Sequence, residues 1–160
     1  MNRRRIAAAS AAILLAFSLM TGCSQGGGKT ITAPTKDVAQ KLQDSISFEY
    51  PLSQLPDDAA NKLYGLDGSI IEEQAVFVGV GGALADEVSV WRVKDEKDAA
   101  TVEEAAEKRV ENQKTSFKDY APAEMPKLEK AVIKTNGDTI ILCVSSDADK
   151  AKEVIASFEE

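Results

Sequence analysis

The chain has 160 residues, with 26 acidic and 19 basic side chains, a net charge of −7 and no histidine. This length supports one domain with a single core. An acidic domain repels nucleic acids and anionic lipid surfaces, so we exclude nucleic-acid binding. The missing histidine excludes Ser–His–Asp and Cys–His catalysis and the usual histidine-containing zinc sites. Carboxylate, lysine or oxygen-ligand chemistry remains.

The start of the chain carries the clearest functional signal. Three arginines at positions 3–5 precede an apolar run of 15 residues, 6–20, which is shorter than the roughly 20 residues of a membrane-spanning helix. The run closes with Leu19-Met20-Thr21-Gly22-Cys23, and the whole segment resembles a bacterial lipoprotein signal peptide with its lipobox. The resemblance implies cleavage before Cys23 and a diacylglyceryl group on its thiol, so membrane lipid is an expected partner. An uncleaved anchor helix is the alternative.

These features divide the chain into three parts. Residues 1–22 are the predicted signal peptide, residues 23–33 a flexible, Gly-rich tether, and residues 34–160 a single folded domain. Removal of the signal peptide takes away three arginines and no acid, so the net charge changes from −7 to −10. The protein is therefore expected at the cell membrane, lipid-anchored on the extracytoplasmic face.

Hydrophobic periodicity and turn residues predict the elements of the domain. In chain order they are helices over 34–45 and 56–64, strands over 74–80 and 87–94, a long helix over 99–119, a short connector over 126–130, strands over 131–134 and 139–145, and a helix over 147–158. Asn136-Gly137 is expected to form a type I′ turn between the last two strands. The order ααββαββα predicts an α+β fold, in which two β-hairpins form a mainly antiparallel sheet of about four strands with helices packed on one face.

The long helix also carries a family resemblance. Its most specific part is the spacing of Arg109, Gln113, Phe117 and Tyr120-Ala121-Pro122, and further matching segments are 73–76, 87–94, 128–129, 136–137 and 143–149. Over Glu72 to Ile155 the chain resembles the bacterial domain-of-unknown-function family 4358, found in lipoproteins of Gram-positive bacteria. The resemblance implies a small, lipid-anchored α+β domain, and it implies no activity.

Arg109, Gln113 and Tyr120 lie on or beside the apolar stripe of the long helix, so their polar ends need partners. One interpretation is a ligand pocket at the edge between helix and sheet, where Arg109 binds a carboxylate or phosphate as a bidentate donor. The other is a structural network, in which Arg109 pairs with an acid such as Glu73 and Tyr120 bonds to the backbone. Both interpretations stay open.

Other motifs are better explained by structure than by chemistry. Cys143 lies in an apolar run and is expected to be buried rather than nucleophilic. Residues 79–82 join two strands, which favours a hairpin connection over a phosphate-binding loop. Asp147 and Asp149 are expected to cap a helix rather than to bind calcium, and adjacent carboxylate pairs indicate solvated charge. No metal or cofactor is expected.

The expected function is that of a non-catalytic, surface-tethered domain that binds an envelope protein or a small ligand, or acts as an accessory to another envelope component. No catalytic residue is identified. The alternatives are a small carboxylate-dependent envelope hydrolase and a purely structural envelope lipoprotein. An enzyme would show a cleft with converging acids, whereas a binding domain would show an exposed apolar patch, around Trp91 or the edge strand.

Overall fold

A computed structural model describes residues 29–81 and 83–160, so the predicted signal peptide, Cys23 and residues 24–28 lie outside the described residues. The helices and strands are α1 (Thr35–Ser45), β1 (Leu52–Gln54), α2 (Asp57–Tyr64), β2 (Ile71–Gly79), β3 (Glu87–Val93), α3 (Ala99–Tyr120), α4 (Met125–Glu129), β4 (Val132–Asn136), β5 (Thr139–Val144) and α5 (Ala148–Ala156). Among these helices, none is long and apolar enough to cross a membrane.

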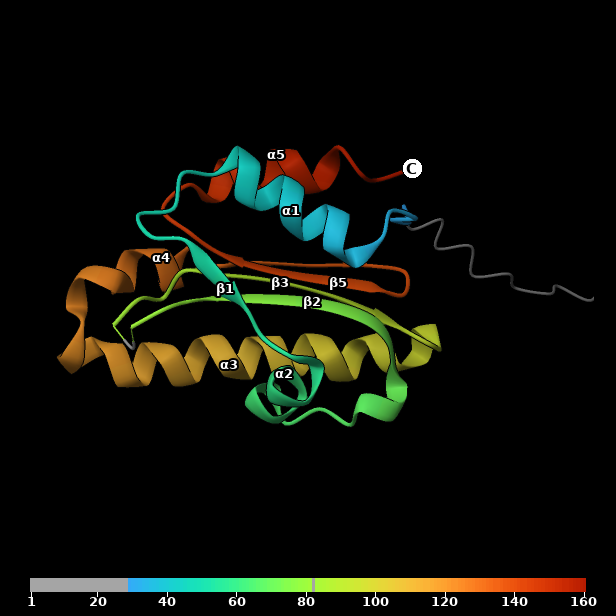
Figure 1. Ribbon diagram of the computed structural model, residues 1–160, viewed down its shortest axis with the longest axis horizontal. Coiled ribbons are helices and arrows are strands. Elements are labelled where there is room, and N and C mark those ends of the chain that lie inside the picture. The colour runs from blue at the N-terminus through green and yellow to red at the C-terminus, as the bar shows by residue number, and fades with distance from the viewer. Residues whose placement is uncertain (1–28, 82) are drawn as a thin grey trace, which may run out of the picture.

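The strands form one antiparallel sheet in the order β1-β2-β3-β5-β4 (Figure 1). The two predicted hairpins, β2–β3 and β4–β5, are both present and meet where β3 pairs with β5. At the centre of the sheet, Val90 lies opposite Ala75 on one side and Ile141 on the other. The α+β class and the antiparallel sheet are therefore confirmed.

Helices cover both faces of the sheet, so the prediction of helices on one face was wrong. In Figure 1, α1 and α5 lie on one face and α2 and α3 on the other. The physical reason is that the central strand β3 carries apolar side chains on both of its faces. Val88 and Val90 pack in the core under α1 and α5, whereas Trp91 and Val93 pack in the core under α3. A strand that is buried on both sides needs a layer of helices on each.

Two local details of the sheet also differ from the prediction. A fifth strand, β1, pairs with residues 77–79 of β2, and its three residues are too few to show a period-two pattern in the sequence. The predicted turn Asn136-Gly137 is displaced by one residue, because Asn136 still pairs with Thr139 in the ladder. The turn residues are therefore Gly137 and Asp138, and Gly137 has a φ of 60°, a conformation that glycine adopts readily.

The predicted tether extends too far at its C-terminal end, because residues 30–33 pack against the domain. Ile31 is buried in the core under α1 and α5. Arg92 on β3 donates from Nη2 to the carbonyl oxygens of Ile31 and Ala33, at 3.0 and 2.7 Å, and its Nη1 pairs with Glu73. Backbone hydrogen bonds also join Thr30 to the last residue of the chain. The folded domain thus includes a clamped N-terminal segment, residues 30–33.

We expect Arg92→Ala to lower the free energy of unfolding by about 2 kcal/mol, because it removes a charged donor from two partly buried carbonyl groups and from Glu73. Urea unfolding of the full-length chain measures the change, and hydrogen exchange should show faster exchange at Ile31. Lys97→Ala is the control, since it breaks only the exposed pair with Asp95 and should leave stability unchanged. Equal stability of the two variants would contradict the clamp.

Candidate functional site

The long helix α3 positions the side chains of the candidate site. Its sequence is rich in Ala, Glu and Lys, all strong helix formers, and it runs for 22 residues along one face of the sheet (Figure 1). Its buried stripe consists of Ala99, Val102, Ala106, Val110, Gln113 and Phe117. Arg109 lies beside this stripe, next to Val110 and one turn before Gln113. A charged and an amide side chain therefore face the region where α3 meets the start of β3.

The centre of the site is a buried carboxylate, Glu87, at the first position of β3. Its side chain is fully buried, and its Oε2 accepts hydrogen bonds from Nη2 and Nε of Arg109 at 3.0 and 3.2 Å. The other oxygen, Oε1, accepts from the hydroxyl of Tyr64 on α2 and from Ser89 Oγ at 3.3 Å. Burial raises the pKa of Glu87, and attraction and hydrogen bonding from Arg109 and Ser89 offset part of that effect.

A cavity of about 390 Å³ opens beside this pair, between α2, α3 and the ends of β2 and β3. This volume is at the small end of the range for ligand pockets. Its apolar lining comes from Leu55, Leu63, Val78, Leu84 and Phe117. Its polar lining comes from Asp86, Glu87, Arg109, Asn112, Gln113 and Ser116. The cavity is amphipathic, with aliphatic and aromatic groups beside a few polar side chains.

Gln113 is the unusual member of this lining. Only 6% of its surface is exposed, and its Oε1 is buried without a hydrogen-bond partner among the described residues. A buried acceptor without a partner costs free energy, about 1–3 kcal/mol, and such groups are rare in folded proteins. The unpartnered Oε1 of Gln113 is therefore an acceptor that a group in the cavity would satisfy.

A second polar cluster holds the chain at the end of the cavity, just before β3. Lys127 on α4 donates to Asp86 Oδ2 at 2.7 Å and to Glu124 Oε2 at 3.0 Å, and Glu124 Oε2 also accepts from the backbone N–H of Ala85 at 2.8 Å. Burial opposes the charge on Lys127, but its two carboxylate partners outweigh this and raise its pKa. The cluster fixes Asp86, which lines the cavity.

The structure brings together two of the three predicted site residues. Arg109 and Gln113 line the same cavity, whereas Tyr120 is 70% exposed and lies beyond it on α3. The predicted partner Glu73 was wrong, because it pairs with Arg92 on the opposite face of the sheet. The true partner is Glu87, an acid at the first position of an apolar strand, and its place in the sequence alone does not distinguish it from Glu73.

The remaining motifs have local structural roles. Cys143 is buried, and burial raises the pKa of its thiol to about 12, so a reactive thiolate is not formed at neutral pH. Trp91, around which an exposed apolar patch was expected, is fully buried. Its ring meets that of Tyr64 edge-on, with centroids 4.7 Å apart.

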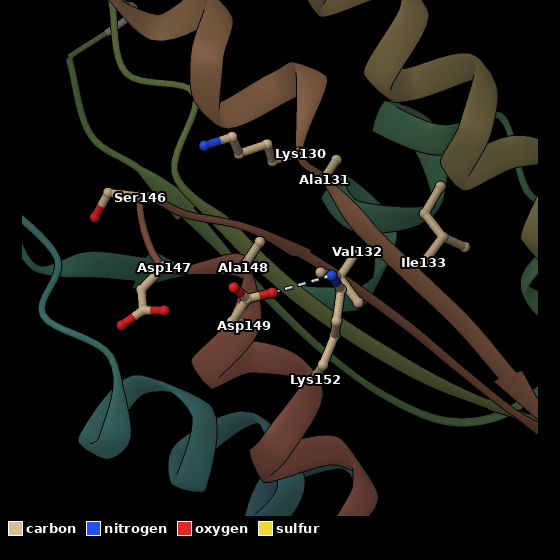
Figure 2. A pocket seen from close by; sticks show the side chains of 9 residues that line it. All are labelled: Lys130, Ala131, Val132, Ile133, Ser146, Asp147, Ala148, Asp149 and Lys152. Carbon is tan, nitrogen blue, oxygen red and sulfur yellow. Dashed lines mark hydrogen bonds and ion pairs between the residues drawn. The ribbon is translucent and has the colours of Figure 1, made fainter.

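The acids at the start of α5 act on the helix itself. Asp147 accepts from the backbone N–H of Lys150 at 2.9 Å, which is the predicted N-cap. Figure 2 shows this region, where a hollow of about 550 Å³ lies between α4, β4 and α5. In it Asp149 pairs with Lys152 at 3.2 Å, and Asp147 stands apart from that pair. Within residues 29–81 and 83–160, no group of three His, Cys, Asp or Glu side chains is placed to hold a metal ion.

Fold and site together define a small α+β domain with three layers, helix–sheet–helix, and an amphipathic cavity beside the long helix. The chain belongs to the family described as Domain of unknown function (DUF4358), whose model matches residues 44–145. The matched range contains the whole sheet, α3 and all the cavity residues, and it leaves α5 and most of α1 outside. No curated protein and no solved structure matches the chain.

The raised pKa of Glu87 predicts how the stability of the folded protein changes with pH. The folded state keeps the proton to a higher pH than the unfolded state, in which the group titrates near its ordinary value of 4.5. This contribution to stability is fully present below that value and is lost as the pH rises through the folded pKa. Because Glu87→Gln does not titrate there, the variant should gain stability relative to the wild type as the pH rises.

Urea unfolding of both proteins at steps between about pH 4 and about pH 8 measures this difference, in which the titrations of all other groups cancel. The expected result is a difference in the free energy of unfolding that moves steadily in favour of Glu87→Gln. A difference that is constant, or that moves the other way, would show that Glu87 is not a buried carboxyl with a raised pKa.

Proposed function

We propose that the protein is an extracytoplasmic lipoprotein, anchored in the cell membrane through an acylated Cys23, whose folded domain binds a ligand or partner at the cell envelope without catalysing a reaction. The proposal of anchoring rests on the sequence of residues 1–23. A diacylglyceryl group supplies two buried chains, and two chains are enough for stable anchoring. The absence of histidine and the burial of Cys143 support a role that is not catalytic.

The observation that carries the binding role is the Gln113 amide. It lines an amphipathic cavity next to Arg109, and its buried Oε1 has no partner within the described part of the chain. A polar group of this kind lowers stability unless something else compensates it. Binding sites retain such groups because a ligand supplies the missing hydrogen bond.

The clamped N-terminal segment bears on how such a domain would stand on a membrane. Arg92 at one end of β3 holds residues 30–33, whereas Glu87 at the other end of β3 lies in the cavity. In Figure 1 the described chain starts at one end of the sheet, and the connection between β2 and β3 lies at the other. Only five residues lie between Cys23 and Lys29, and the six steps along the chain reach at most about 20 Å. Tethered in this way, the domain would present its cavity away from the anchor.

One observation favours the alternative, a small carboxylate-dependent hydrolase. Asp86 and Glu87 both line the cavity, and the pKa of Glu87 is raised, as that of a general acid would be. However, both oxygens of Glu87 accept hydrogen bonds from protein groups, and Asp86 is paired with Lys127. A carboxylate held in this way has a structural role, so binding without catalysis is the better supported function.

Site-specific crosslinking tests the proposal on the full-length protein in its own membrane. A photoreactive residue at Leu63, which is 39% exposed at the cavity, should capture a defined envelope component. The same residue at Tyr50, which is 51% exposed and lies outside the cavity, is the matched control. Mass spectrometry of the mature N-terminus should find diacylglyceryl on Cys23, and Cys23→Ser should release the protein from the membrane.

The outcomes separate the two parts of the proposal. An unmodified Cys23 with the protein in the soluble fraction would contradict anchoring. Equal crosslinking from both positions, or none from Leu63, would contradict binding at the cavity. Turnover of an envelope polymer that is lost in Glu87→Gln would favour the hydrolase instead.

A further inference from the structure

The charges around the cavity argue against an anionic ligand. Arg109 directs Nε and Nη2 at Glu87, so the fork that would bind a carboxylate or phosphate is already occupied. Two salt-bridged clusters lie here, Glu87 with Arg109 and, separately, Asp86 and Glu124 with Lys127, and the second cluster has two acids for one base. An anion entering here would meet a neutralised guanidinium and a net negative wall.

The polar group that remains available is neutral. A carboxamide such as that of Gln113 offers an acceptor and donors on one rigid plane, and rotation about its last side-chain bond exchanges them. Its best complement is a second amide, which carries an N–H and a C=O side by side. A peptide unit has this pattern, and it brings no charge into the cavity.

Exposed hydrophobic side chains occur on the segments that form the cavity. Four large hydrophobic side chains are exposed in the described residues, and three of them belong to segments that form the cavity. Leu63, 39% exposed, lines it, and Val80, 59% exposed, follows the lining residue Gly79. Tyr120, 70% exposed, lies one turn beyond Phe117 on α3. Exposed hydrophobic groups on neighbouring segments are typical of protein-interaction surfaces.

We propose that the cavity binds a peptide segment of an envelope polypeptide. One aliphatic side chain of that segment lies between Leu55, Leu84 and Phe117, and the neutral backbone amide beside it pairs with Gln113. Leu63, Val80 and Tyr120 contact the flanking residues. This inference rests on the proposed function, since it names the class of ligand that the same site takes.

The test uses two small probes that differ only in their C-terminal group, N-acetyl-L-leucinamide with a neutral amide and N-acetyl-L-leucine with a carboxylate, added to the isotope-labelled full-length protein in detergent micelles. The side-chain amide resonances of Gln113 report binding at the cavity. We expect saturable shifts with the amide and binding at least about tenfold weaker with the carboxylate, because the carboxylate meets the acidic wall.

Two glutamine variants supply a matched comparison. Gln113→Met should weaken binding of the amide about tenfold, the effect of one lost hydrogen bond, followed through backbone resonances of α3. Gln74→Met should leave it unchanged, because Gln74 also has a buried, unpartnered Oε1 but does not line the cavity. If a variant does not fold, the comparison of the two probes on the wild-type protein still decides the ligand class.

The outcomes distinguish this inference from the function on which it rests. Tighter binding of the carboxylate, or equal binding to the Gln113→Met variant, overturns the peptide class. Shifts confined to residues outside the cavity overturn it too. If crosslinking from position 63 then captures a glycan, a lipid or a second copy of this chain, the binding function stands and only the peptide class fails. If neither probe binds and position 63 captures nothing, both fail.

Discussion

The buried ion pair between Glu87 and Arg109 is the interaction on which the rest of the site depends. It joins the first residue of β3 to the middle of α3, and Tyr64 brings α2 to the same carboxylate. Taking the Glu87 carboxylate out of water is costly, and two hydrogen bonds from the partly buried Arg109 to one oxygen, with Tyr64 and Ser89 at the other, offset that cost. The pair therefore fixes how α3 lies on the sheet, and the cavity is the space left beside it.

The two faces of the sheet have different roles because different side chains of the same strands point to each. On one face, Arg92 holds the N-terminal segment against α1 and β3, so the point at which the chain enters the domain is fixed. On the other face, Glu87 and Arg109 set the polarity of the cavity. Because these two sites lie at opposite ends of β3, the proposed tether and the proposed binding surface lie at opposite ends of the domain.

The sequence predicted most elements because their patterns are local. The helical stripe from Val102 to Phe117 follows from the spacing of apolar residues alone. The second layer of helices was not predicted. Val88 and Trp91 lie on opposite faces of β3 and both are apolar, and the alternation of apolar and polar residues does not reveal a sheet covered by helices on both faces. The partner of Arg109 was missed because Glu73 and Glu87 look alike in sequence. The register of β2 and β3 puts Glu73 opposite Arg92, and the packing of α3 on the other face of the sheet puts Glu87 beside Arg109.

A double-mutant cycle between Glu87 and Arg109 tests this account most directly. Glu87→Gln, Arg109→Leu and the double variant would be compared with the wild-type protein by urea unfolding at neutral pH. If the pair organises the site as described, the two substitutions are coupled by about 2 kcal/mol, because the second removes little once the first has broken the pair. Free energies that add to within about 0.5 kcal/mol would show that the two side chains act independently, and would contradict the account of how α3 and the cavity are held in place.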